Sequence, residues 1–266
     1  MSSSDHLGEQ GIHERKIRAV FGAGVSCAGE AQAFDHPLVL LAFSNRSGSN
    51  LLAHYLRTTR AFAGFHELLN HEGLLNHAKE WGVSGVADYV KRVSAEYGKP
   101  GRIFGFKASW DQILMLLRFE VPRLYDGVRI IHITRQDVIG QAVSYLIAHQ
   151  TRRWTSLQAA DPGASVNYDE ALLERLLEET HRSEAMIATL SNAFAIPRLV
   201  VTYEGLQAQP GALLKRIGAF TGVDIGPLTL PKPRIGKQAD AVNEEFRARF
   251  TEHLRRRALA QARIWA

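Results

Sequence analysis

The sequence predicts an α/β fold with a central parallel sheet flanked by helices. Short apolar runs typical of strands alternate with longer segments in which leucines recur at helical spacing. No shift in composition and no internal repeat divides the 266 residues. Alternating strands and helices of this kind form βαβ units whose strands pair in parallel. We therefore expect one domain over residues 37–266, preceded by a loosely ordered extension over residues 1–36 that shows no clear period.

The composition is that of an ordinary globular protein. The hydrophobic fraction of 45% and the charged fraction of 22% exclude a largely disordered chain, a collagen and a disulfide scaffold. Cys27 is the only cysteine, and the first ten residues lack an apolar signal core, so we expect a cytoplasmic protein. The net charge of +5 owes much to arginines near the C-terminus. We interpret them as a solvated helix face, which predicts no nucleic-acid partner and at most peripheral membrane contact.

The first βα unit is the best defined segment of the sequence. Residues 38–43 read LVLLAF, a continuous apolar run typical of a strand buried on both faces. A polar turn follows at residues 44–49, and residues 50–57 carry leucines at helical spacing. The pattern predicts a strand, a loop of small residues and a helix.

Later segments repeat this alternation. Strands are expected at residues 102–107, 128–134 and 197–203, and helices at about residues 138–153, 168–194 and 211–221. Asp137 stands just before the helix at 138–153 and is a good N-cap for it.

The polar turn after the first strand has the composition of an anion-binding loop. Ligands of open parallel sheets bind at the carboxyl ends of strands. Ser47, Gly48 and Ser49 are small, so their amides can approach an anion closely, and the helix that follows adds its positive end. Arg46 supplies charged donors. The loop lacks the Gly-Lys-Ser/Thr ending of a Walker A motif.

A second polar cluster follows the strand at residues 128–134. Arg135 stands just past the strand, and Ser144 lies two turns into the next helix, on the same face as Gly140 and Gln141. Two anion sites at one sheet edge suit a ligand with two separated phosphates.

Six stretches together carry a resemblance to a known family. They read LVLLAFSNRSGSNLLAHYLR, FHELLN, FGFKASWDQ, VRIIHITRQDVIGQAVSYLIAHQTRRW, VTYEGLQAQPGALLKRIGAFTG and PKPRIGKQAD. In this order they resemble the sulfotransferases that use 3′-phosphoadenosine 5′-phosphosulfate (PAPS), above all the bacterial trehalose 2-sulfotransferase branch and the nodulation-factor sulfotransferases. The resemblance implies a P-loop NTPase-like sulfotransferase fold. It also implies transfer of a sulfuryl group from PAPS to a carbohydrate or glycolipid hydroxyl, adenosine 3′,5′-bisphosphate as product, and a homodimer. The histidines show no metal-ligand spacing and there is one cysteine, so we expect no metal site.

The resemblance also implies how the donor is bound. The residues that match the 5′-phosphosulfate loop are Arg46, Ser47, Gly48, Ser49 and Asn50. Arg135 and Ser144 match the pair that binds the 3′-phosphate. Tyr203 matches a tyrosine near the adenine, and Lys237 falls in a loop that closes over the nucleotide.

The catalytic residues follow from the same match. Common eukaryotic sulfotransferases have Lys-Thr-His where this chain has Lys107-Ala108-Ser109, so the histidine base is missing. The trehalose branch has a proposed glutamate base, which Glu67 matches, with His66 as second choice. We expect apolar neighbours to raise the pKa of Glu67. Lys107 would neutralise charge on the leaving phosphate.

The acceptor site and two alternative functions complete the predictions. The residues expected to bind the acceptor are Asn45, His66, Glu67, Asn70 and Trp110. The identity of the acceptor stays open, because residues 64–66 differ from the pattern of the trehalose enzymes. A catalytically silent 3′,5′-bisphosphate-binding protein and a nucleotide-dependent kinase of similar fold are the alternatives.

Overall fold

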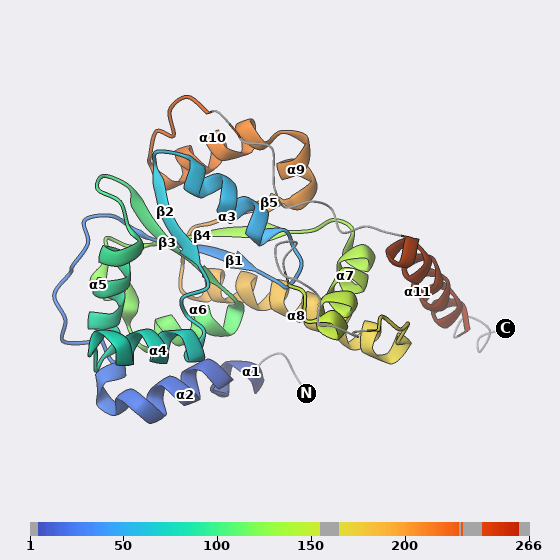
Figure 1. Ribbon diagram of the computed structural model, residues 1–266, viewed down its shortest axis with the longest axis horizontal. Helices are drawn as coiled ribbons and strands as arrows, with labels where there is room; N and C mark the ends of the chain where they lie inside the picture. Colours follow the sequence, from blue (N-terminus) through green and yellow to red (C-terminus); the bar gives the residue numbers. More distant parts are fainter. Residues whose placement is uncertain (1–4, 155–164, 229, 231–240, 261–266) are drawn as a thin grey trace. The chain divides into compact units, whose positions relative to one another are not determined.

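A five-stranded parallel sheet organises the chain (Figure 1). The computed structural model describes residues 5–154, 165–228, 230 and 241–260. The strand order is β2-β3-β1-β4-β5, and every pairing in it is parallel. The strands are β1 (Leu38–Phe43), β2 (Phe62–His66), β3 (Ile103–Ala108), β4 (Val128–Thr134) and β5 (Arg198–Thr202). The predicted α/β fold with a central parallel sheet is confirmed.

Helices occupy most of the remaining described residues. Before and within the first half of the sheet lie α1 (Asp5–Gly8), α2 (Ile12–Phe21), α3 (Ser49–Thr58), α4 (His71–Trp81), α5 (Val86–Tyr97) and α6 (Trp110–Arg118). The later helices are α7 (Val138–Thr151), α8 (Glu170–Ala193), α9 (Tyr203–Ala208), α10 (Pro210–Thr221) and α11 (Ala241–Ala260). Two short 3₁₀ helices are η1 (Gly22–Val25) and η2 (Val121–Leu124).

The elements expected from the sequence agree with these bounds to within two residues. The strands at 38–43 and 128–134 are β1 and β4 without a shift. Asp137 caps α7 as predicted, because its Oδ1 accepts from the Gly140 amide at 3.0 Å. A Cβ at Gly140 would lie 2.2 Å from the same carboxylate, so the group that approaches Gly140 closely is this cap.

The described residues divide into two compact units. One holds the sheet and comprises the chain up to Ser44, residues 48–134, and residues from Arg182 to 230. The other comprises Asn45–Ser47, Arg135–His181 and residues 241–260. The sequence shows no composition break at these boundaries.

Alternation along β1 builds a core on each face of the sheet. Leu38 and Leu40 pack with α5 and α6 on one face, whereas Val39 and Leu41 pack with α3 and α10 on the other. Figure 1 shows these helix pairs on opposite faces of the sheet. Because both faces are covered, the strand has to be apolar at every position, which explains its sequence.

The connections single out the carboxyl end of β1. The chain leaves β1 for α3 on one face, and it leaves the neighbouring β3 for α6 on the other. Open α/β sheets bind ligands at such a switch point. The fold therefore places the loop after β1 and the end of β3 where a ligand is expected.

The described part of the N-terminal segment contains α1, α2 and η1, which the sequence analysis did not predict. Ile17 of α2 is fully buried, and Glu14 is buried beside Arg18 and Arg118. Arg118 Nη1 donates to Glu14 Oε2 at 2.6 Å. The contact with Arg118 spans about a hundred residues, so the local pattern of a charged helix could not reveal it.

The second unit packs α11 against α7 and the first half of α8. Phe246 and Phe250 of α11 are buried with Leu146 and Leu173. Most other side chains of α11 are exposed, as expected for a solvated basic face, and Arg249 lies 3.9 Å above the Tyr168 ring. Among the described helices, none has the length and apolarity needed to cross a membrane.

Candidate functional site

The loop after β1 takes a conformation that needs two left-handed residues. Arg46 has φ 63° and Gly48 has φ 92°. A Cβ at Gly48 would lie 2.4 Å from Cδ2 of Tyr203, so only glycine allows the tyrosine ring to lie against the loop. The helix α3 then begins at Ser49, and its first amides have no partners within the helix. This loop brings together Gly48 and Tyr203, two predicted nucleotide-binding residues.

Ser47 provides a polar atom that fits an anionic ligand. Its side chain is fully buried, and its Oγ has no hydrogen-bond partner in the described part of the chain. A buried hydroxyl without a partner costs free energy. A phosphate or sulfate oxygen would satisfy this hydroxyl.

Lys107 connects the loop to the predicted base. Its side chain is 3% exposed at the carboxyl end of β3. Nζ donates to Asn50 Oδ1 at 2.5 Å and to Glu67 Oε1 at 2.5 Å, and it lies 4.6 Å from the Phe43 ring centroid. Three predicted site residues from distant parts of the sequence therefore meet at one ammonium group.

Burial and the charge of Glu67 act in opposite directions on the pKa of Lys107. Burial lowers the pKa of Lys107, and the carboxylate of Glu67 partly opposes this effect. The pKa of His66 is also lowered, first by desolvation and then by Arg57 and Lys107. His66 therefore favours the neutral form, which can accept a proton, and stays a second candidate for the base.

Glu67 does not have the apolar surroundings expected from its neighbours in the sequence. Its side chain is 47% exposed and is paired with Lys107. The apolar residues beside it in the sequence, Leu68 and Leu69, are buried in the core and leave the carboxylate outside. The preceding backbone is constrained, since Phe65 has φ 54°. The expected apolar environment of Glu67 was wrong.

Two of the predicted acceptor residues, Asn70 and Trp110, stand where the helices α4 and α6 begin. Asn70 precedes α4, and its Oδ1 accepts from Gln112 Nε2 at 2.7 Å. Trp110 begins α6 and packs, partly buried, against the core. The Gln112 side chain thus ties the start of α4 to the start of α6.

In the second unit, Asn45 and Arg46 are held by α7. Asn45 Nδ2 donates to the Tyr145 hydroxyl at 2.7 Å, and the Asn45 carbonyl accepts from Gln141 Nε2 at 2.7 Å. Arg46 Nε donates to Ser144 Oγ at 3.0 Å. Ser144, predicted to bind the 3′-phosphate, is thus a partner of Arg46, and Asn45 uses its amide within the protein.

Arg135 and Lys237 are the remaining residues that were predicted to bind the nucleotide. Arg135 follows β4, and its Nη2 lies 3.7 Å from Asp137 Oδ2. Lys237 falls outside the described residues. Across the described segments, no three His, Cys, Asp or Glu side chains form a group that could hold a metal ion.

Sequence reasoning missed several residues that hold the loop. Tyr145 donates to Glu179 Oε1 at 2.9 Å, and its pKa is raised first by burial and then by the charge and the hydrogen bond of Glu179. The Trp154 carbonyl accepts from Arg46 Nη1. Tyr145 lies one residue after Ser144 in a motif that was already singled out, so its neighbourhood was a usable signal. The Trp154 contact is made by a backbone carbonyl, which every residue has, so the sequence contains no signal for it.

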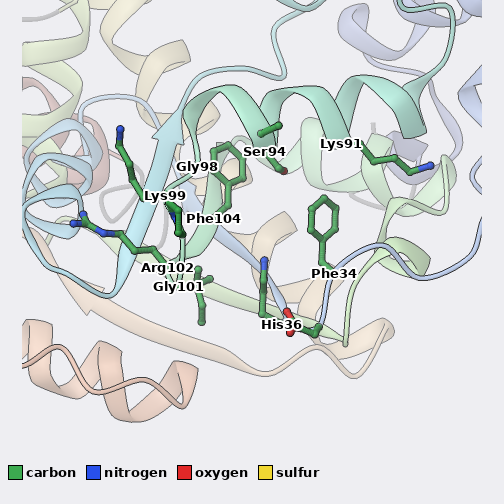
Figure 2. Close-up of a pocket in the computed structure, with 13 residues that line it drawn as sticks. Phe34, His36, Lys91, Ser94, Gly98, Lys99, Gly101, Arg102 and Phe104 are labelled. Atoms are coloured by element: carbon green, nitrogen blue, oxygen red, sulfur yellow. The ribbon is translucent and has the colours of Figure 1, made fainter.

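A separate cavity lies at the amino ends of β1 and β3. It has a volume of about 660 Å³ and is bounded by α5 and by the segments that enter β1 and β3. Figure 2 shows Phe34, His36 and Ser94 along its wall, with the charged ends of Lys99 and Arg102 directed away from them. None of the predicted site residues lines it.

Known proteins with similar sequences agree with the predicted family. Residues 38–253 match the family model of the Stf0 sulphotransferases. A trehalose 2-sulfotransferase of Mycolicibacterium smegmatis is 25% identical over 85% of this chain and 98% of its own length. A trehalose 2-sulfotransferase of Mycobacterium tuberculosis is 24% identical over 80% of this chain and 94% of its own.

Solved structures are more distant. The sulfotransferase domain of the Synechococcus olefin synthase is 15% identical, with a TM-score of 0.49 over 84% of this chain and 97% of that one. The family match spans β1 to β5, the loop at the carboxyl end of β1 and the Lys107 cluster. On this evidence the chain belongs to the Stf0 sulphotransferase family.

Proposed function

We propose that this protein transfers the sulfuryl group of PAPS to a hydroxyl of a carbohydrate or glycolipid, with Glu67 as general base. The observation that carries the proposal is the Lys107 cluster. One buried ammonium contacts Asn50, at the start of α3, and Glu67, the predicted base. A cation between an anion-binding loop and a carboxylate suits a reaction that moves negative charge toward the loop.

The proposed donor fits the loop by its chemistry. The buried Ser47 hydroxyl lacks a partner, and Gly48 lets the backbone lie against Tyr203. These residues, the α3 amides and Asn50 would bind the 5′-phosphosulfate. Arg135 and Ser144 remain the proposed ligands of the 3′-phosphate.

The proposed reaction is an in-line displacement. The acceptor oxygen forms a bond to sulfur while the bond between sulfur and the 5′-phosphate oxygen breaks. Glu67 takes the proton of the acceptor hydroxyl. Lys107 and the loop amides stabilise the charge on the leaving bisphosphate, as in phosphoryl transfer.

A carbohydrate acceptor is supported by the names of the two mycobacterial relatives. It is also consistent with the exposed carboxylate of Glu67, which a polar, hydrated acceptor could reach. At 25% identity we propose the acceptor class and leave the particular sugar open.

Calorimetric titration with adenosine 3′,5′-bisphosphate tests the proposal, with ADP and magnesium-ATP as controls. We expect the bisphosphate to bind about 10- to 1,000-fold more tightly than ADP, because charge-assisted contacts to the 3′-phosphate are worth a few kcal/mol. Preference for magnesium-ATP would contradict the proposal and favour a kinase. Tight bisphosphate binding without transfer from PAPS to any of a panel of glycans would favour a silent binding protein.

A further inference from the structure

We propose that Glu184 is a positioning residue that fixes the start of the anion-binding loop, residues 44–50. Ser44 follows β1 directly, is 2% exposed, and donates from Oγ to Glu184 Oε1 at 2.5 Å. Glu184 lies on α8 and comes 140 residues after Ser44 in the sequence. The inference rests on the proposed function only in that this loop would bind the phosphosulfate.

The second oxygen of Glu184 faces a buried histidine. His132 Nε2 lies 2.8 Å from Glu184 Oε2, and the His132 side chain is 2% exposed. His132 sits on β4, opposite Ala42 of β1 in the sheet register. One carboxylate oxygen of Glu184 therefore contacts the first residue of the loop, and the other lies near a residue of β4, the strand next to β1.

Arg198 determines which nitrogen of His132 carries the proton. Arg198 Nη1 lies 3.0 Å from His132 Nδ1, and a guanidinium can only donate. Nδ1 must accept, so the ring proton is on Nε2, which lies close to Glu184 Oε2 without forming a hydrogen bond of normal geometry. A chain of polar contacts thus runs from β5 through β4 to Glu184 and ends at the Ser44 hydroxyl.

The loop needs such an anchor because its backbone is unfavourable. Arg46 at φ 63° and Gly48 at φ 92° hold left-handed conformations. A non-glycine residue in this region is strained and persists only where its surroundings enforce it. At one end the loop is fixed by α3, and at the other by the bond from Ser44 to Glu184. A preorganised loop binds its ligand without a further ordering cost.

A carboxylate close to a loop that binds anions also needs an explanation. Its charge opposes a negatively charged ligand, so a purely structural partner for Ser44 would be neutral. A charged acceptor forms a stronger hydrogen bond than a neutral one. The strong bond accounts for the glutamate if its role is to keep the Ser44 end of the loop in place.

The test uses Ser44→Ala, Glu184→Ala and Glu184→Gln, with Glu178→Gln as control. Glu178 is exposed on the same helix. Hydrogen exchange of the loop amides in the ligand-free protein measures positioning directly. We expect exchange at residues 47–50 to be at least about tenfold faster in Ser44→Ala and Glu184→Ala. Glu184→Gln, whose amide oxygen can still accept from Ser44, should show a smaller change.

Ligand affinity provides the second measurement. Calorimetry should show that Ser44→Ala and Glu184→Ala weaken adenosine 3′,5′-bisphosphate binding about tenfold, and that the double variant is no weaker than either single one. Lower melting temperatures with unchanged loop exchange and unchanged affinity would overturn the proposal, because Glu184 would then only stabilise the fold. Faster exchange in a protein that never binds the bisphosphate would support the positioning role and refute the proposed function.

Discussion

Lys107 illustrates how one residue acquires a role from its partners. A lysine at a strand end is ordinarily exposed, whereas this one is 3% exposed and has two oxygen partners within 2.5 Å. Burying an ammonium is costly unless it is paired. The free-energy cost is offset by Glu67 and Asn50, so removing either partner should destabilise the fold as well as alter the site.

Glu67→Gln tests the proposed base. If Glu67 accepts the acceptor proton, the variant should lower kcat by about 10²–10⁴ while the affinity for adenosine 3′,5′-bisphosphate changes little. Transfer from PAPS and calorimetry measure the two quantities, with His66→Gln as the matched variant. A kcat loss confined to His66→Gln would instead make His66 the base.

Gly48→Ala tests the close approach of Tyr203 to the loop. The new Cβ would lie 2.4 Å from the ring at a residue with φ 92°, so we expect a loss of about 1–3 kcal/mol in the free energy of unfolding. Urea unfolding measures it. Gly73→Ala is the control, since its Cβ would meet nothing within 4 Å in α4 and should stabilise by up to about 1 kcal/mol. Equal stability of the two variants would contradict the expectation.

At the scale of elements, the N-terminal segment supports the helix that follows the predicted base. Asn70 does not cap α4 with its side chain, which is bonded to Gln112. His13 of α2 takes this role, because its Nδ1 accepts from the His71 amide at 3.1 Å. The same nitrogen lies 2.9 Å from His71 Nδ1. A segment expected to be loose thus provides a helix cap beside the loop that carries Glu67.

This cap predicts a pH-dependent stability. Burial lowers the pKa of His13 below 6.5, and His71 adds to this effect, whereas Asp111 and Glu72 oppose it. The folded state then binds fewer protons than the unfolded state, so stability is lost as the pH falls below 6.5 toward the lowered pKa.

His13→Asn separates titration from capping. The Asn oxygen can accept from the His71 amide but does not titrate, so its free energy of unfolding should fall less between pH 7.5 and 5.5 than that of the wild type. His13→Ala should lose about 1 kcal/mol at pH 7.5. Urea unfolding at both values measures this, with exposed His181→Asn as control. Parallel pH profiles for wild type and His13→Asn would rule out the titration of His13.

At the scale of the whole molecule, the sheet topology decides where a ligand can act. The connections from β1 and β3 leave for opposite faces, and Lys107, near the carboxyl end of β3, contacts Asn50 and Glu67. The cavity at the amino ends has no predicted site residue. The homodimer and the cytoplasmic location stay predictions.

Ligand binding should therefore stabilise the folded protein as a whole. Adenosine 3′,5′-bisphosphate at 100 times its Kd should add about 2.7 kcal/mol to the free energy of unfolding, which corresponds to a rise in Tm of several degrees for a chain of this size. Thermal unfolding with increasing ligand measures the shift. ADP at the same concentration should give a smaller shift, and equal shifts would argue against recognition of the 3′-phosphate.

Local patterns in the sequence determined β1, β3, β4 and β5, the helices α3, α7, α8 and α10, and the polar loop after β1. The apolar run at 38–43 predicts a strand buried on both faces because only a doubly covered strand is apolar throughout. The short edge strand β2 escaped prediction, since Gly64 interrupts its five residues and the strand is defined by pairing with β3.

Only the tertiary structure decided the contacts that turn these segments into a site. The pairs Lys107 with Glu67 and Ser44 with Glu184 join residues 40 and 140 positions apart. Sequence periodicity reports on neighbours within a few residues, so it can indicate that a side chain is polar but not which group will face it. The strand order β2-β3-β1-β4-β5 supplies that information, because it brings the carboxyl ends of β1 and β3 side by side.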